Sequence, residues 1–512
     1  MAGMERELKV EVDESFQVPD LIQLVGLSVV SLPEVALDAT YYDTNTLELA
    51  RWGVTLRHRT SSSGAAKWTL KLPDAADAGG DALPGLSRDE VDFDAPAGPV
   101  PSDAAALLTT YVRHEPLEPV ARLQTRRRRH LLMSATDTLA ELDDDTVEFA
   151  LPDGRSGEFR ELEIELAATG PTALLRRIHD TLVRAGVDDS APRPKVVRAL
   201  GTAPGPLLPV PAAWSGSLTT TGLVQRSLTN GLTGWLSDDP RLRLGEDPAA
   251  LGRTHAAVRR LLSQVEALRR WLDRGWSETV ASGLATVVGR LSDLADLDAV
   301  VGRLLAASGR LAAEDQPSAV RLSEMLASQR QSHQDDLAEL MDSDVYLGLV
   351  DELVSAAWEP PISRGANRPA RAVWERATRR RVDRLTDQSD ARWLASRHPA
   401  RRPPGEDETT APVEQAVAEA LHAVELALPL GGRAARSLHD SLVALDDLVV
   451  EMHHATIAQR WLRDSVATLD GRLGLAAGQL LAAETNQVDE ARRAWRPAWK
   501  SFRQRAGKWP ET

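Results

Sequence analysis

The chain has 512 residues, a length that predicts two or three domains. Its formal net charge of −15 argues against a general nucleic-acid binder, which usually has a basic footprint. The absence of cysteine excludes disulfides, zinc–thiolate sites and thiol nucleophiles. No run approaches the ~20 apolar residues of a membrane span, and the first residues lack the basic start and apolar run of a signal peptide. We therefore expect a soluble, cytoplasmic protein with no membrane partner.

The opening stretch MERELKVEV, residues 4–12, has the two-residue period of a β-strand. Alternate residues from Glu5 to Glu11 are charged and share one face, whereas those from Leu8 to Val12 are apolar and share the other. This strand therefore has one charged face and one face suited to a core.

The same alternation recurs up to about residue 200, as in LRHR (56–59), WTLKLP (68–73), VARLQTRRRRHLL (120–132) and FRELEIEL (159–166). Turn segments such as SSSG separate these runs, so the pattern predicts an antiparallel sheet or barrel. One helical pattern, at 170–186, ends on a glycine, as helices often do.

Each of these strands has a charged face of mixed sign. The residues that share such a face within their strands are Arg57 with Arg59, Arg88 with Glu90, Arg122 with Arg126 and Arg128, and Glu161 with Glu163 and Glu165, while Lys71 lies opposite its apolar neighbours. Solvated faces and a charged barrel interior explain this pattern about equally well. An interior would need ligands, because buried unpaired charge is costly: a polyphosphate for the basic groups and a divalent cation for the carboxylates.

A proline-rich stretch follows, and beyond it the apolar residues have the 3.6-residue period of helices almost to the end of the chain. We expect a first domain over 1–202, a linker over 203–213, and an all-α helical bundle of about eight to ten helices over 214–512.

Residues 1 to about 200 resemble the CYTH proteins, the triphosphate tunnel metalloenzymes. The resemblance rests on ERELK (5–9), which matches the family's E-x-E-x-K signature, and on further motifs in the family's order: YYDT (41–44), LRHR (56–59), WTLKLP (68–73), RDE (88–90), RLQTRR (122–127), DDTV (144–147) and ELEIEL (161–166). It implies an α+β chain whose N-terminal domain is an eight-stranded antiparallel β-barrel forming a tunnel, in which Mg²⁺ or Mn²⁺ supports hydrolysis or cyclisation of triphosphates.

The family's functional residues can be carried over by position. The resemblance implies that Glu5, Glu7 and Lys9 are catalytic residues. It implies that the metal ligands are Glu5, Glu7, Asp145, Glu163 and Glu165, and that Glu90 and Glu161 are further acidic tunnel residues. The implied phosphate-binding residues are Lys9, Arg57, Arg59, Lys71, Arg126 and Lys195, with Arg122 or Arg128 replacing the basic residue that the family usually has at Gln124.

The leading hypothesis is therefore a triphosphatase that acts on inorganic triphosphate or a related triphosphorylated compound. A nucleotide cyclase and a thiamine triphosphatase are alternatives within the same family. A non-catalytic phosphate- or polyphosphate-binding protein is the alternative from another class, although two acidic strands would repel its ligand. The run RRRR (126–129) does not favour nucleic acid, because strand alternation sends only half of it to any one face.

The helical half resembles a CHAD domain, which has two helical repeats with basic, histidine-containing faces and binds polyphosphate in some members. EDPAALGRTHAAVRRLL (246–262) follows the first repeat and keeps Arg259 and Arg260, but several expected basic positions are lost. The resemblance implies a divergent CHAD domain that serves as a scaffold or as a phosphate- or partner-binding module. His255, His453 and His454 could bind a metal or an anion, but we favour ordinary surface or interhelical histidines.

Overall fold

The computed structural model describes residues 3–19, 28–73, 86–134, 137–188, 193–201, 205–245, 247–388, 411–466, 469 and 471–509. The chain divides into two compact units, Met1–Leu207 and Leu208–Thr512. That residues 203–213 act as a linker stays a prediction.

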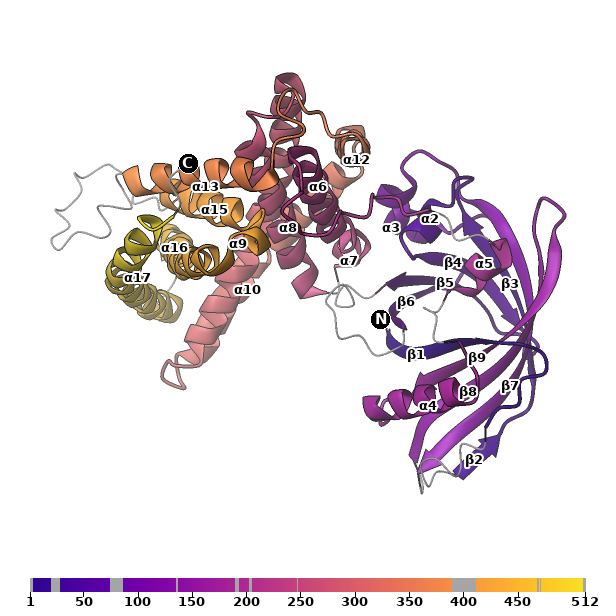
Figure 1. Ribbon diagram of the computed structural model, residues 1–512. Helices are drawn as coiled ribbons and strands as arrows, with labels where there is room; N and C mark the ends of the chain where they lie inside the picture. The colour runs from indigo at the N-terminus through magenta and orange to yellow at the C-terminus, as the bar shows by residue number, and fades with distance from the viewer. Residues whose placement is uncertain are drawn as a thin grey trace. The chain divides into compact units, whose positions relative to one another are not determined.

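The first unit is built mainly from β-strands (Figure 1). They are β1 (Gly3–Val12), β2 (Ser28–Ser31), β3 (Val35–Asp43), β4 (Thr55–Ser61), β5 (Ala66–Pro73), β6 (Leu86–Phe93), β7 (Glu118–Ser134), β8 (Asp137–Ala150) and β9 (Ser156–Leu166). Its helices are α2 (Glu48–Arg51), α3 (Ser102–Val112), α4 (Thr172–Arg184) and α5 (Lys195–Leu200).

The strands form one curled antiparallel sheet in the order β2-β7-β3-β4-β5-β6-β1-β9-β8. The sheet closes on itself, because β7 pairs with β3 over residues 118–127 and with β8 over residues 122–134. Eight strands therefore form a ring, and β2 only extends the edge of β7 beyond β3. This confirms the predicted eight-stranded antiparallel barrel.

The outer side of the barrel carries a core of its own. Apolar residues from β1, β8 and β9 pack there against α4 (Figure 1), whose residues Leu174, Leu175, Ile178 and Leu182 recur at helical spacing. Because successive side chains of a strand point to opposite faces, the alternate residues of these three strands point into the barrel.

One part of the barrel interior is apolar, and α5 lies against it. Val196, Val197 and Ala199 of α5 join a core with the inward residues of β3, β7 and β8, including Leu123 and Val147. The interior therefore has two zones: an apolar zone around α5 and a charged zone described below.

The second unit is helical. Its helices are α6 (Thr220–Leu236), α7 (Asp239–Leu244), α8 (Pro248–Leu268), α9 (Arg274–Ser308), α10 (Gln316–Ala327), α11 (Arg330–Met341), α12 (Asp344–Trp358), α13 (Ala370–Asp387), α15 (Ala411–Glu425), α16 (Gly432–Val466) and α17 (Gly471–Ala506), with a short 3₁₀ turn η2 (Leu428–Leu430). This confirms the predicted helical bundle. The described part holds eleven α-helices rather than eight to ten, partly because the six-residue α7 is too short to show a period in the sequence.

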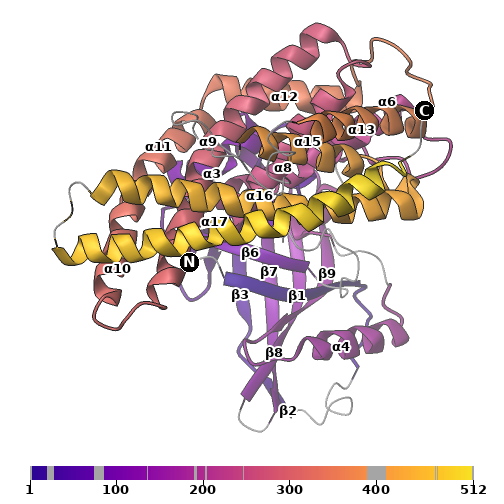
Figure 2. The same cartoon turned by 90° about the vertical axis from the view of Figure 1, so that its left-hand side faces the viewer.

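The longest helices of this unit pack as neighbours. Figure 2 shows α16 and α17 running side by side, and residues of both join α9 and α10 in one core that includes Leu304, Leu322, Leu462 and Leu480. Among the described residues, no helix combines the length and the apolar character needed to cross a membrane.

Candidate active site

Three carboxylates gather in the charged zone of the barrel, where β8 and β9 pair. Asp145 lies directly opposite Glu161 in the register, and Glu163 is two residues further along β9 on the same face. All three residues are buried, with exposed fractions of 0%, 2% and 8%, and they offer oxygen atoms within 4.8 Å of one another. Such clustered oxygens are the ligand type that Mg²⁺ and Mn²⁺ prefer.

The ammonium of Lys195, at the start of α5, lies among these three carboxylates. Its Nζ is 2.9 Å from Asp145 Oδ2, 2.8 Å from Glu161 Oε1 and 2.6 Å from Glu163 Oε1. Lys195 itself is buried, with 8% of its surface exposed. A buried lysine is stable only beside such partners, since an unpaired buried charge is costly.

Two more cations contact the same carboxylates. The Arg127 guanidinium donates to both oxygens of Asp145, at 2.9 and 2.7 Å, and to Glu163 Oε2 at 2.6 Å. The Lys9 ammonium lies 2.7 Å from Glu163 Oε1 and 3.1 Å from Glu7 Oε1. The charged side chains of β1, β7, β8, β9 and α5 thus form one network.

The network perturbs the acidity of its members. Burial alone would raise the pKa of Glu163, but the charges of Lys195, Lys9 and Arg127 outweigh it and hold that pKa well below its ordinary value. Burial raises the pKa of Asp143 to about 7, despite the nearby Arg127. Strongly shifted groups gathered in one cavity are typical of a functional site.

The β4 arginines have a different environment. Arg57 Nη1 donates to the Tyr41 hydroxyl at 3.2 Å, and in the part of the chain that the structure describes neither Arg57 nor Arg59 pairs with a carboxylate. The charge of Arg57, then burial, then the charge of Arg127 lower the pKa of Arg59 to about 10. Adjacent cations that form no ion pair with a carboxylate of the described residues favour an anion beside them, and guanidinium groups suit phosphate oxygens.

A further ion pair joins neighbouring strands in the same interior. Lys71 of β5 lies directly opposite Glu90 of β6, and their charged groups are in contact. Lys71 is buried, whereas Glu90 is half-buried.

The structure brings most of the predicted site residues into this charged zone. They are Glu7, Lys9, Arg57, Arg59, Lys71, Glu90, Asp145, Glu161, Glu163 and Lys195. Glu165 follows Glu163 on the same face of β9 but is exposed. The backbone of Glu5 pairs with Arg88, and its side chain lies outside the described part of the structure. The catalytic, metal and phosphate roles of all these residues stay predictions.

The predicted face of β7 needs a correction. The side chains of Arg122, Arg126 and Arg128 are 60%, 63% and 55% exposed on the outer face, where they lie near Asp38, Glu158 and Asp144. They do not join the charged zone, in which β7 is represented by Arg127. Ala121 and Leu123, on the other face of β7, belong to the apolar zone inside the barrel.

Sequence reasoning therefore missed Arg127 as an interior residue. Directly opposed residues of an antiparallel pair point to the same side. Arg127 is opposed to Asp145, so the register of β7 on β8 places it inside. The sequence alone does not contain that register.

Comparison with known families identifies both halves of the chain. The model of the CYTH domain matches residues 3–188, and that of the CHAD domain matches residues 226–463. The chain carries a CYTH domain followed by a CHAD domain. This order confirms the resemblance inferred from the motifs.

Two uncharacterized proteins from strains of Mycobacterium tuberculosis are each 34% identical over 221 residues, which cover 40% of this chain. The match spans 42% of the length of those relatives.

Solved structures show more distant likeness. PptA from Streptomyces chartreusis is 21% identical, with 55% of this chain and 100% of that chain covered and a TM-score of 0.45. The CHAD domain from the plant Ricinus communis is 16% identical, with coverages of 56% and 94% and a TM-score of 0.43. HpAC1 from Hippeastrum, named as a putative adenylyl cyclase with a dominant triphosphatase activity, is 18% identical, with coverages of 39% and 97% and a TM-score of 0.24.

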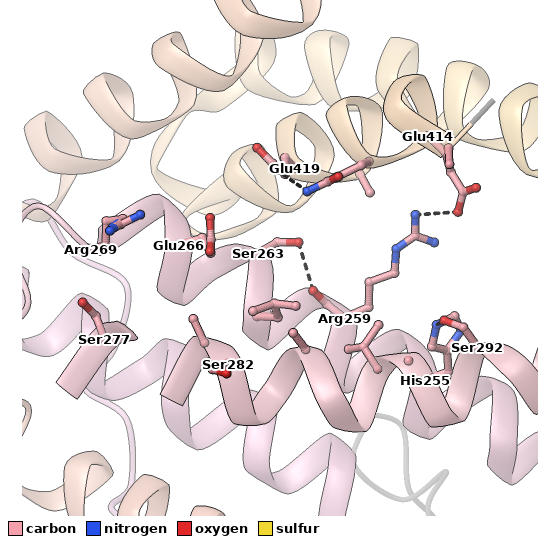
Figure 3. Close-up of a pocket in the computed structure, with 18 of the residues that line it drawn as sticks. His255, Arg259, Ser263, Glu266, Arg269, Ser277, Ser282, Ser292, Glu414 and Glu419 are labelled. Atoms are coloured by element: carbon pink, nitrogen blue, oxygen red, sulfur yellow. Dashed lines mark hydrogen bonds and ion pairs between the residues drawn. The ribbon is translucent and has the colours of Figure 1, made fainter. Parts of the chain in front are cut away.

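The CHAD domain contains a pocket of about 690 Å³ between α8, α9 and α15 (Figure 3). Its walls carry both signs of charge: Arg259 on α8 and Arg269 directly after it, and the carboxylates of Glu266, Glu278, Asp296, Glu414 and Glu419. Arg259 Nη2 donates to Glu414 Oε1 at 2.8 Å, as Figure 3 shows. A polyanion would meet carboxylates here and would have to compete for the arginine.

Of the predicted histidines, His255 and His453 line this pocket, and His454 follows His453 on α16. His453 Nε2 lies 3.2 Å from Asp296 Oδ2, and its Nδ1 lies 3.3 Å from Glu414 Oε2. His454 Nε2 is 3.4 Å from Asp296 Oδ1, and His255 Nε2 is 3.0 Å from the Ser292 hydroxyl. These contacts join α8, α9, α15 and α16, which agrees with the interpretation of interhelical histidines.

Proposed function

We propose that the CYTH domain hydrolyses inorganic triphosphate, or a closely related triphosphorylated compound, with the help of Mg²⁺ or Mn²⁺. The observation that carries the proposal is the asymmetry of the barrel interior. One side gathers three buried carboxylates, and the other holds two neighbouring arginines without carboxylate partners. A complex of a divalent cation with triphosphate matches this arrangement, because its cation suits the carboxylates and its anion suits the arginines.

The carboxylates fit the cation. Asp145, Glu161 and Glu163 would hold it through oxygen ligands, and Glu7 lies on the neighbouring strand, in contact with Lys9. When bound, such a cation withdraws charge from the phosphoryl group that is transferred.

The basic residues supply the rest of the site. Arg57 and Arg59 bind non-bridging phosphate oxygens through their guanidinium groups, while Lys9 and Lys71 contribute point charges. Together they hold the anion in one orientation and stabilise the charge that builds up in the transition state. In the overall reaction a water oxygen bonds to the terminal phosphorus, the anhydride P–O bond breaks, and orthophosphate and pyrophosphate are released.

The test is phosphate release from inorganic triphosphate by the full chain, with Mg²⁺ or Mn²⁺ and with EDTA. We expect metal-dependent release that falls about a hundredfold or more in Glu7→Gln. Arg126→Met, which changes an exposed arginine of the outer face of β7, is the matched control and should keep the rate within about twofold.

The non-catalytic alternative has its own outcome. If neither triphosphate nor a small panel of organic triphosphates, nucleotides and thiamine triphosphate included, yields phosphate or a cyclic product, the barrel is a binding module. Full activity in Glu7→Gln would contradict the role of Glu7.

A further inference from the structure

Lys195 occupies the centre of the carboxylate cluster. Of the three cations Lys9, Arg127 and Lys195, only Lys195 contacts all of Asp145, Glu161 and Glu163 among the described residues, at 2.6 to 2.9 Å. These are the same three residues whose oxygens are close enough together to hold a metal ion. An ammonium within 3 Å of all three carboxylates and a divalent cation liganded by them would fill the same space.

We propose that Lys195 is a tethered counter-ion that competes with the divalent cation, so that metal binding requires its ammonium to leave the carboxylate cluster. This inference rests on the proposed function, because it takes the cluster as the metal site. It assigns to Lys195 a role besides phosphate binding: it neutralises three buried acids until the metal replaces it.

The side chain can leave without unfolding α5. Val196 and Val197 are buried in the apolar zone and hold the helix, while the flexible four-carbon stem of Lys195 carries the charge. Lys195 also lies close enough to the Tyr41–Arg57 pair for its charge to act on the Tyr41 hydroxyl. A displaced ammonium can therefore turn toward the arginine side, where the triphosphate would bind.

The charge balance links the two ligands. Replacing one ammonium by a divalent cation at the cluster adds positive charge to the interior, and the displaced ammonium adds to the cationic side. Metal bound in this way strengthens the attraction for triphosphate, and by linkage triphosphate strengthens the attraction for metal.

The experiment measures Mn²⁺ binding to the full chain without any phosphate, from the electron paramagnetic resonance signal of free Mn²⁺. We expect Lys195→Met to bind Mn²⁺ at least tenfold more tightly than the wild type, because no ammonium has to be displaced. Lys195→Arg keeps the cation and should stay within about threefold of the wild type.

Arg198→Met is the matched control for a general change in charge. Arg198 lies on the same helix, but its guanidinium is 3.6 Å from Glu161 and 3.5 Å from Glu11, and among the described residues it has no contact with Asp145 or Glu163. Its loss should tighten Mn²⁺ binding less than threefold. If Arg198→Met tightens binding as much as Lys195→Met, the effect is a general electrostatic one and the competition is overturned.

Folding is monitored by circular dichroism and thermal unfolding of each variant. Lys195→Met without metal removes the one ammonium that contacts all three acids and leaves the cluster with excess negative charge, so Mn²⁺ should raise its melting temperature more than that of the wild type. Unchanged or weaker Mn²⁺ binding in folded Lys195→Met overturns the inference. Since wild-type phosphate release is measured separately, that result leaves the proposed triphosphatase standing, whereas inactive wild-type protein overturns the triphosphatase.

Discussion

Arg59 and Arg127 lie in the same barrel interior but have opposite surroundings. Arg127 contacts Asp145 and Glu163, whose charges raise its pKa well above the ordinary value although burial opposes this. Arg59 forms no ion pair with a carboxylate in the described part of the chain, and the neighbouring charge of Arg57 lowers its pKa. The first arginine stabilises the fold, while the second is the one that we propose to bind the phosphate ligand.

This difference predicts opposite effects on stability. Arg127→Met should lower the free energy of unfolding of the CYTH domain by about 3 kcal/mol, because it removes one of the cations that compensate the buried carboxylates of Asp145 and Glu163. Arg59→Met should leave it unchanged or slightly higher, because it removes repulsion between like charges. Urea denaturation of both variants measures the change in the free energy of unfolding. Separately, Arg59→Met should lose the binding of triphosphate. Equal destabilisation by the two substitutions would contradict the assignment.

At the scale of elements, histidine side chains join helices of the CHAD domain. His453 on α16 lies between Asp296 of α9 and Glu414 of α15, while Arg259 of α8 adds positive charge nearby and the ring of His454 lies beside it. Burial opposes protonation of His453, but Asp296 and Glu414 outweigh it and raise its pKa above 6.5. When it is protonated, the ring can pair with the carboxylates of both neighbouring helices.

The sign of the pH dependence follows from that shift. A group whose pKa is higher in the folded state stabilises the fold below its unfolded pKa and loses that contribution as the pH rises through the folded pKa. The CHAD domain should therefore melt at a lower temperature as the pH is raised from about 6 through the folded pKa of His453. In His453→Gln this decrease should be smaller, and thermal scans across this pH range compare the two. If the melting temperature of the variant decreases as much as that of the wild type, His453 is not the cause of the decrease.

At the scale of the whole molecule, each unit has a hydrophobic core of its own. The barrel has cores on its outer side around α4 and inside around α5, and the helical unit has a core around α9, α10, α16 and α17. A chain built in this way is expected to unfold in more than one step.

Binding of triphosphate to the CYTH domain should therefore raise the melting temperature of the CYTH transition and leave that of the CHAD transition unchanged. Inorganic triphosphate with EDTA, which allows the anion to bind but removes the metal, should raise the CYTH melting transition in differential scanning calorimetry. The stabilisation is about 2.7 kcal/mol when the ligand concentration is a hundred times the Kd. Arg59→Met should abolish the shift. A comparable shift of the CHAD transition would instead show that the helical domain binds the anion.

Several features could be predicted from sequence because they depend on local patterns. The alternation in β1 and β9 placed Glu7, Lys9, Glu161 and Glu163 on one face, and the structure has them there. The same period was not enough for β7, where Arg126 was expected inside and Arg127 lies there. Both faces of β7 carry apolar and basic residues, so period alone does not tell the inner face from the outer.

The sequence by itself determined the two classes of structure, the family motifs and the presence of charged strand faces, because strand and helix periods are properties of neighbouring residues. Only the tertiary structure decided how those charges meet. It placed Lys195 among three carboxylates from β8 and β9, and it left Arg57 and Arg59 without acidic partners in the described residues. These relations depend on strand register, ring closure and the position of α5, which bring together residues distant in the chain, and no local pattern contains them.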